Sequence, residues 1–208
     1  MTSRSKMAVA LGALVLVALG GVAAFYSGQG GAGNSTCSAA TTKLAQLRPL
    51  VKGEIAAIQV PQKSTPVPDL AFNGPDGKPT SLSAMRGRTV LVNLWATWCP
   101  PCLLEMPALA KLQKTLGGPD FEVVTVNIDT RNLDKPKEWL AKKDIAGLAY
   151  YADPEAKVFQ DLRAAKKAEG MPVSLLVDPQ GCELATLQGP AEWAGTEALA
   201  LIRTALGR

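Results

Sequence analysis

Two cysteines separated by two residues, Cys99 and Cys102, stand in the stretch Trp-Ala-Thr-Trp-Cys-Pro-Pro-Cys at residues 95–102. Thiols at this spacing can join in a disulfide, so the pair can cycle between a reduced and an oxidised form. We expect a helix to begin here, where unpaired backbone N–H groups and the positive end of the helix dipole favour thiolate over thiol. The motif therefore predicts a redox site.

A metal site is the alternative use of such a pair. A structural zinc ion needs about four Cys or His ligands, usually as two close pairs. The chain of 208 residues has no histidine, and its other cysteines, Cys37 and Cys182, are far apart in the sequence. The ligand count favours redox chemistry, and we expect neither a metal nor a cofactor. The lack of histidine also excludes His-based acid/base catalysis and Ser-His-Asp arrangements.

Elements on both sides of the motif must hold it in place. Residues 89–95 are almost all apolar, as expected of a strand buried on both faces. Residues 103–116 repeat leucine at positions 104, 109, 112 and 116, which predicts a helix with a buried leucine stripe that ends at Gly117. Pro107 lies inside this helix and should kink it, because proline has no backbone N–H.

The rest of the chain alternates strand and helix patterns. A helix broken at Pro49 and Gly53 is expected over 38–57, and a hairpin around the turn residues Asn73-Gly74 and Asp76-Gly77. Further strands are expected at 121–128, 148–151, 173–177 and 182–187, and further helices at 135–143, 154–168 and 193–206. This order predicts an α/β fold with a mixed sheet covered by helices on both faces.

The N-terminal residues predict a membrane anchor. Residues 7–26 carry no charge, and a helix of that length matches a bilayer core of about 30 Å. Arg4 and Lys6 precede this block, which places the N-terminus in the cytoplasm and the rest outside. A cleaved signal peptide is the alternative, because Val22-Ala23-Ala24 has the small side chains typical of a signal-peptide cleavage site. Residues 27–36 indicate a flexible tether.

Several features accompany the cysteine motif: Pro107 five residues after the second cysteine, Met171-Pro172 before a late strand, and the segments 105–107, 127–130 and 189–193. Together with Trp98 to Cys102, they resemble the thioredoxin superfamily, and more closely the membrane-anchored periplasmic TlpA/ResA-like thiol-disulfide oxidoreductases. The resemblance covers residues 62–207 and implies a thioredoxin-like fold with a cis-proline at Pro172. An extra helix and strand at about 131–151 is similar to the central insert of that branch.

The expected organisation has four parts. They are a membrane anchor or signal peptide (1–26), a tether (27–36), an N-terminal helical extension (37–60) and a thioredoxin-like domain (61–208).

The resemblance also implies roles for the site residues. Cys99 is the nucleophile that attacks a disulfide of a partner, and Cys102 resolves the mixed disulfide. Thioredoxin carries a buried carboxylate six residues before the first cysteine, but Asn93 stands there in this chain and cannot titrate. Glu105, three residues after Cys102, is a candidate proton acceptor. The alternative is that Glu105 complements the positive end of the helix dipole, and both interpretations stay open.

A substrate groove is implied around Trp98, Pro100, Pro101, Met171 and Pro172. The two prolines that follow Cys99 have no N–H, which leaves Cys102 as the nearest backbone donor to the Cys99 thiolate. Stabilisation of that thiolate should be moderate, which favours a reductant over a strong oxidant. Met171 has the alternative of filling space in the core.

The remaining cysteines, Cys37 and Cys182, are expected to form a structural disulfide, because an even number of cysteines in an oxidising compartment usually pairs. Two free thiols are the alternative. Non-reducing peptide mapping separates the two cases.

The resemblance implies an enzyme at the inner membrane, with a single span and a periplasmic domain. Its partners would be client proteins with reducible disulfides, in copper-site assembly for cytochrome oxidase or in cytochrome c maturation, and a membrane electron donor. A Cu(I)-binding metallochaperone that uses the same cysteines is the alternative. A peroxidase is disfavoured because Ala96 stands where threonine is needed. With a net charge of only +4, no nucleic acid is expected to bind.

Overall fold

The computed structural model of the chain describes residues 37–208. The expected anchor or signal peptide (1–26) and the tether (27–36) lie outside this range. Within residues 37–208, no helix combines the length and the apolar character needed to cross a membrane.

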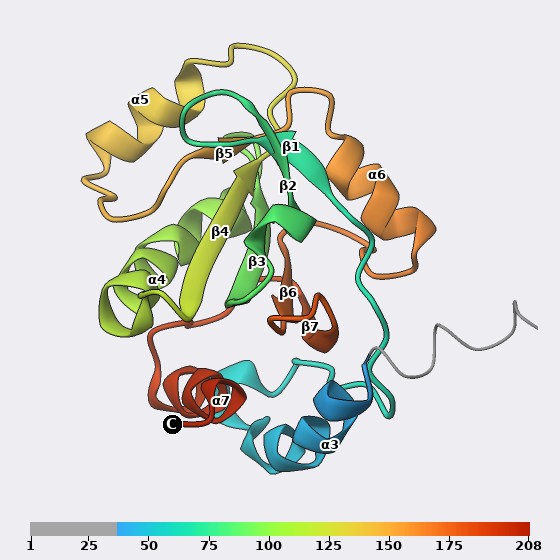
Figure 1. Cartoon of the computed structure of the whole chain (residues 1–208). Helices are drawn as coiled ribbons and strands as arrows, with labels where there is room; N and C mark the ends of the chain where they lie inside the picture. Colours follow the sequence, from blue (N-terminus) through green and yellow to red (C-terminus); the bar gives the residue numbers. More distant parts are fainter. Residues whose placement is uncertain (1–36) are drawn as a thin grey trace, which may run out of the picture. The chain divides into compact units, whose positions relative to one another are not determined.

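Seven strands form one mixed sheet in the order β2-β1-β5-β4-β3-β6-β7 (Figure 1). Their bounds are β1 Ala71–Asn73, β2 Pro79–Ser81, β3 Thr89–Trp95, β4 Phe121–Asn127, β5 Tyr151–Ala152, β6 Val173–Val177 and β7 Glu183–Gln188. β3 is flanked by parallel β4 and antiparallel β6, and all seven of its residues are buried. The strand that leads into the cysteine motif is therefore an interior strand of the sheet, buried as predicted.

The helices lie on both sides of this sheet, as the sequence predicts. They are α3 Ser38–Leu47, α4 Pro100–Leu116, α5 Lys135–Lys142, α6 Lys157–Ala164 and α7 Thr196–Leu206. Figure 1 shows α4 and α6 on opposite sides of the central strands, while α5 lies beside the end of β4. The insert of α5 and β5 adds a strand that pairs with β4 in parallel and with β1 in antiparallel orientation.

The N-terminal extension packs against α7 and β7 through α3. Two 3-10 turns, η1 Arg48–Leu50 and η2 Gly53–Ile55, follow α3. The helix is interrupted at Pro49 and Gly53, as the sequence predicts. Gly53 has a φ of 60°, a left-handed conformation that glycine adopts without strain. A disulfide joins Cys37, at the start of α3, to Cys182, just before β7. It ties the extension to the edge strand.

Three expectations about element boundaries or faces were wrong. Leu104 was placed in a buried stripe, but its side chain is 79% exposed, because the buried face of α4 runs through Cys102, Glu105, Met106 and Leu109. The helix expected from 154 begins at Lys157, because Ala156 has a left-handed φ of 51°. The strand expected at 148–151 covers only Tyr151 and Ala152.

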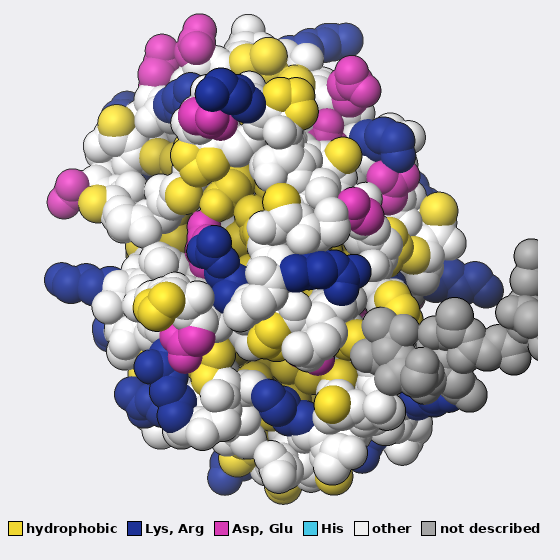
Figure 2. Space-filling view, viewed as in Figure 1, with side chains coloured by type: hydrophobic (Ala, Val, Ile, Leu, Met, Phe, Trp, Pro, Cys, Tyr) yellow, Lys and Arg dark blue, Asp and Glu magenta, His cyan; other side chains and the backbone are white. Residues whose placement is uncertain are grey.

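The surface in Figure 2 carries basic and acidic side chains side by side rather than in separate fields. Apolar side chains gather in a hollow between the β1–β2 hairpin and the segment before β5. A cavity of about 360 Å³ in this part of the fold is lined by hairpin residues together with Met85, Glu122 and Tyr151. The Tyr151 hydroxyl donates to Glu122 Oε1, which ties the insert strand to β4.

Candidate active site at the start of helix α4

Cys99 and Cys102 form a disulfide at the N-terminus of α4, with their Cα atoms 5.3 Å apart. Cys99 is the N-cap of the helix, and the Cys102 backbone N–H donates to its Sγ at 3.3 Å. This is the donor expected after two prolines. Cys102 is fully buried and Cys99 is 4% exposed. Cys99 is therefore the less buried of the two cysteines, and it lies at the helix end where a thiolate is favoured.

The turn before Cys99 is held by Asp129, which lies just beyond β4. The Thr97 backbone N–H and hydroxyl donate to the two oxygens of Asp129, each at 2.9 Å, and Asn127 Nδ2 donates to Asp129 Oδ2 at 2.8 Å. β3 and β4 are parallel with Trp95 opposite Asn127, so both chains leave the sheet at the same edge. This contact fixes where Cys99 lies relative to the sheet.

Glu105 is 2% exposed and lies one turn after Cys102 on the same buried face of α4. Its carboxylate accepts hydrogen bonds from Asn93 Nδ2 at 2.8 Å, Trp193 Nε1 at 3.0 Å and the Ala191 backbone N–H at 3.2 Å. Burial raises the pKa of Glu105 from 4.5 to about 7, against the opposing effect of these three hydrogen bonds. The group can therefore gain or lose a proton near neutral pH.

The dipole interpretation of Glu105 does not fit this position. Glu105 is the sixth residue of α4, and the first turn of the helix contains no acidic residue. Interactions with the helix dipole fall off within the first turn. The proton-acceptor role is the interpretation that the geometry leaves, and it stays a prediction.

Asn93 stands at the centre of this buried cluster. Besides donating to Glu105, its Nδ2 donates to the Ser174 hydroxyl at 2.9 Å, and Ser174 lies opposite Asn93 in the β3–β6 pairing. The contacts of Glu105 with Ser174, through Asn93, and with Trp193 were not foreseen. Asn93 and Ser174 each interrupt an apolar strand with a polar side chain, a signal that points to a buried polar cluster.

The residues of the expected groove surround the cysteine turn with different exposures. Trp98 is 60% exposed, Pro100 is exposed, Pro101 and Met171 are half-buried, and Pro172 is buried. The Met171–Pro172 peptide bond is cis. Pro172 immediately precedes β6, whose Val173 pairs with Leu94 of β3, so this bond lies at the same edge of the sheet as the disulfide.

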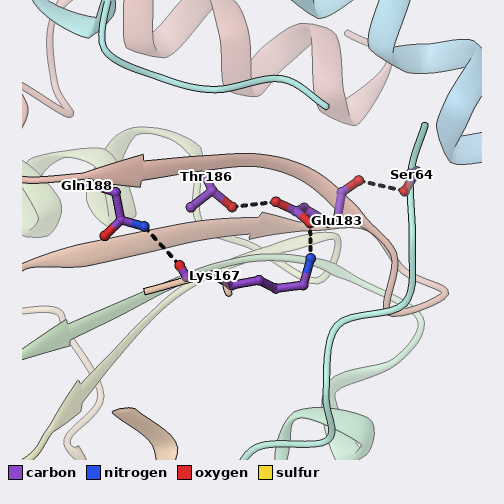
Figure 3. A network of polar contacts seen from close by, with 5 residues as sticks. All are labelled: Ser64, Lys167, Glu183, Thr186 and Gln188. Atoms are coloured by element: carbon purple, nitrogen blue, oxygen red, sulfur yellow. Dashed lines mark hydrogen bonds and ion pairs between the residues drawn. The ribbon is translucent and has the colours of Figure 1, made fainter. Parts of the chain in front are cut away.

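The segment that leads into Met171 is fastened to the edge strand β7 by the network in Figure 3. Lys167 and Glu183 form an ion pair, and each side chain is less than 15% exposed. Gln188 Nε2 donates to the Lys167 carbonyl at 2.9 Å, and the Glu169 backbone N–H donates to Gln188 Oε1 at 3.1 Å. Both bonds tie the approach to the cis-proline to one strand.

Other polar groups of this network reach the N-terminal part of the domain. The Ser64 hydroxyl donates to the Glu183 carbonyl at 2.6 Å, and the Thr186 hydroxyl donates to Glu183 Oε1 at 2.5 Å (Figure 3). Within residues 37–208, no cluster of three or more His, Cys, Asp or Glu side chains is arranged to hold a metal ion. Trp95 is fully buried, with its ring centroid 5.9 Å from that of Trp139, as expected of a packing residue.

Comparison with known proteins places this site in a family. The Redoxin family model matches residues 62–201. The chain is 44% identical over 66 residues to the thioredoxin-like protein YneN of Bacillus subtilis and 36% identical over 61 residues to the thiol-disulfide oxidoreductase ResA of the same organism. These matches cover 32% and 29% of this chain, but only 38% of YneN and 34% of ResA.

A solved structure agrees over a longer stretch. It is a protein from Chlorobium tepidum provisionally described as the thiol:disulfide interchange protein DsbE, with 31% identity and a TM-score of 0.58. The match covers 68% of this chain and 96% of that protein. It confirms the predicted thioredoxin-like fold. The chain belongs to the Redoxin family, in its ResA/TlpA-like branch.

Proposed function

We propose that the protein is a thiol-disulfide oxidoreductase in which Cys99 and Cys102 are the reacting groups. The observation that carries the proposal is the disulfide at the N-terminus of α4, with Cys99 as the N-cap and Cys102 buried behind it. The names of ResA and of the structural relative agree with this activity. We assign Cys99 as the nucleophile because it caps the N-terminus of α4 and is the less buried of the two cysteines.

The reaction consists of two exchanges. The Cys99 thiolate attacks one sulfur of a client disulfide, which forms a Cys99–client disulfide and releases the other client sulfur as a thiolate. The Cys102 thiolate then attacks Cys99 Sγ and releases the second client sulfur. The client disulfide is reduced to two thiols, and the Cys99–Cys102 dithiol is oxidised to the disulfide seen in this structure.

Glu105 is the group that we assign to accept the Cys102 proton before the second exchange. Cys102 is fully buried, so its thiol has little access to solvent. Glu105 follows on the same buried face and has a pKa of about 7, which suits proton transfer at neutral pH. Asn93, at the position of the thioredoxin carboxylate, serves instead as a hydrogen-bond donor that orients Glu105.

We propose the reducing direction for this exchange. Within the turn, the Cys102 backbone N–H donates to Cys99 Sγ, and Pro100 and Pro101 have no N–H to add. A strong oxidant needs a reduced form stabilised well beyond this. The clients that we propose are proteins of copper-site assembly for cytochrome oxidase or of cytochrome c maturation. A membrane electron donor would restore the dithiol.

The proposed location is the inner membrane, with the domain in the periplasm. The support comes from the uncharged block at residues 7–26 after Arg4 and Lys6, and from the Cys37–Cys182 disulfide, a bond typical of oxidising compartments. A Cu(I)-binding metallochaperone stays the alternative function. Copper titration of the reduced chain, compared with its redox titration, separates the two functions.

Two cysteine variants test the activity. The reduced full-length chain is mixed with dithiodipyridine, an uncharged disulfide that releases the coloured product thiopyridone. We expect the native chain to release two equivalents and Cys102→Ser to release one, with the other pyridyl group left on Cys99. Cys99→Ser should react far more slowly, because Cys102 is buried. Equal rates for the two variants would contradict the assignment of the nucleophile.

The Cys102→Ser variant also identifies clients. Expressed in the native membrane, it should retain a client in a mixed disulfide with Cys99, which non-reducing electrophoresis and mass spectrometry would resolve. Partners from cytochrome oxidase assembly or from cytochrome c maturation would name the pathway. Recovery of proteins from neither process would overturn the proposed clients while leaving the activity intact.

A further inference from the structure

Large apolar side chains that are exposed in residues 37–208 gather at one edge of the sheet. They are Trp98, Leu104 and Leu133, with exposed fractions of 60%, 79% and 50%. Trp98 and Leu104 follow β3, and Leu133 follows β4. β3 and β4 are parallel, so both strands end at the edge that carries the Cys99–Cys102 disulfide. Apolar surface marks an interaction site where it is contiguous, so the lining of the surface beside the disulfide is decisive.

An open groove begins beside the disulfide and runs along α4. Its first part has a volume of about 510 Å³ and is lined by Pro100, Leu103, Leu104, Pro107, Trp139 and Ile145, together with Lys143. Pro100 is the residue after Cys99 in the chain, so this apolar end lies next to the cysteine turn. The walls are α4 on one side and the insert on the other, which Figure 1 shows next to each other.

The groove changes character away from the disulfide. A second hollow of about 670 Å³ shares Pro107, Lys143 and Ile145 with the first and adds Lys111 and Lys114. All three lysines are exposed, and none forms an ion pair within residues 37–208. Asp144 is the acidic residue among the lining side chains. The groove is thus apolar near Cys99 and basic at its far end.

This groove is separate from the one formed by Met171 and Pro172. In the sheet order, β3 lies between β4 and β6. The cis-proline bond precedes β6, whereas the insert with α5 follows β4. The two surfaces therefore lie on opposite flanks of the cysteine turn, and a client seated on the cis-proline side would leave the α4 groove open to another segment of the same client.

We propose that the α4 groove binds a segment of the client polypeptide in which apolar side chains near the reactive cysteine are followed by acidic residues. The inference rests on the proposed oxidoreductase function. The apolar part would cover Leu104 and Trp139, and the acidic part would lie against Lys111, Lys114 and Lys143. Charge complementarity of this kind mainly speeds association and selects partners. The groove would choose clients, while Cys99 carries out the exchange.

Three synthetic peptides test the proposal. Each has one cysteine as its thiopyridyl disulfide, followed by leucines and then by glutamates, serines or lysines. The Cys99 thiolate attacks the peptide sulfur, a Cys99–peptide disulfide forms and thiopyridone leaves. The rate constant for each peptide is divided by that for dithiodipyridine, which has no peptide to bind. We expect the glutamate peptide to give a ratio about tenfold above that of the lysine peptide at low salt, with the difference lost at high salt.

Charge and shape variants locate the binding surface. Lys111→Glu with Lys114→Glu should remove or reverse the preference for glutamate, and Leu104→Ser should lower the ratio for all three peptides. Lys52→Glu with Lys78→Glu, two exposed positions that do not line the groove, is the control with the same change of charge and should change nothing. Equal ratios for the three native peptides, or a preference that survives the double variant, would overturn the proposal. Failure to reduce dithiodipyridine would instead contradict the oxidoreductase function itself.

A second copy of the chain is the competing occupant of the groove. Light scattering over a range of protein concentrations tests it. We expect a monomer throughout. A dimer that dissociates in the Leu104→Ser variant would assign the groove to self-association and would overturn the proposal.

Discussion

Glu105 draws its properties from residues that are distant in the sequence. Asn93 comes from β3, and the Trp193 indole and the Ala191 backbone N–H come from the segment before α7. Each of these donors stabilises the charged carboxylate, while burial favours the neutral acid. Burial is the larger effect, so the pKa rises to about 7. Because this pKa lies near neutral pH, the protonation of Glu105 can be followed through the pH dependence of stability and through NMR of its carboxyl group.

Stability of the oxidised chain should fall as the pH rises. The unfolded chain releases the Glu105 proton near pH 4.5, whereas the folded chain holds it up to a pH of about 7. The folded state binds more protons between these values, so the free energy of unfolding decreases through this window, by up to about 3 kcal/mol. Denaturant unfolding of the oxidised chain at several pH values measures it. Glu105→Gln should lack this component; an identical pH profile in the variant would contradict the assignment.

Trp193→Phe should raise the pKa of Glu105 further. The variant keeps an aromatic ring but removes the indole N–H that donates to Glu105 Oε2 at 3.0 Å. A hydrogen bond to a charged group contributes about 1.5–3 kcal/mol, so the expected rise is about one pKa unit or somewhat more. Carbon NMR of the labelled Glu105 carboxyl measures it. An unchanged or lower pKa would show that this bond does not stabilise the carboxylate.

At the level of elements, the sequence predicted the strands next to the site better than the helix faces. Every residue of β3 was placed correctly, because a run of apolar residues as long as one strand has few alternatives. In α4 the leucines at 109, 112 and 116 are buried as predicted, but the stripe does not extend to the first turns of the helix. Leu104 is exposed, and Glu105, a charged residue, occupies the buried side. A polar residue held by distant donors breaks the apolar pattern on which the prediction depends.

The orientation of α4 has a direct test in two leucines. Leu109→Ala should lower the free energy of unfolding by about 2–5 kcal/mol, because Leu109 is fully buried and the substitution leaves a cavity. Leu104→Ala, on the exposed face, should change it by less than about 0.5 kcal/mol. Denaturant unfolding compares the two variants. Similar losses in both would support the leucine stripe that the sequence suggested.

The contacts that hold the segment before the cis-proline, and the pKa of Glu105, could not be predicted from local sequence patterns. The ion pair between Lys167 and Glu183 and the hydrogen bonds of Gln188 join segments that are 16 to 21 residues apart in sequence. No local pattern encodes such pairings. The cysteine motif and Met171-Pro172 were recognisable because their chemistry depends on residue type and spacing.

At the scale of the whole molecule, the Cys37–Cys182 disulfide spans 145 residues and joins the N-terminal extension to the edge of the sheet. Replacing both cysteines with alanine should lower the free energy of unfolding by about 2–5 kcal/mol, since a closed loop restricts the unfolded chain. Thermal or denaturant unfolding with Cys99 and Cys102 kept oxidised measures the loss. A double variant as stable as the native chain would mean that packing alone holds α3 in place.

The described chain has one disulfide at the cysteine motif and a second, Cys37–Cys182, that links the start of α3 to the residue before β7. The two differ in surroundings. All four cysteines are buried, but an open groove begins at Pro100, the residue after Cys99. We therefore expect reductants to act on the Cys99–Cys102 disulfide first.

The reduction potential of the Cys99–Cys102 couple tests the central claim most directly. The full-length chain is equilibrated with mixtures of reduced and oxidised dithiothreitol or glutathione, and the fraction of Cys99 that is reduced is determined by alkylation and mass spectrometry. The account predicts a potential closer to that of thioredoxin, about −270 mV, than to that of the periplasmic oxidant DsbA, about −120 mV. A potential near the latter would contradict a reductant, and a pair that does not exchange at all would contradict the function.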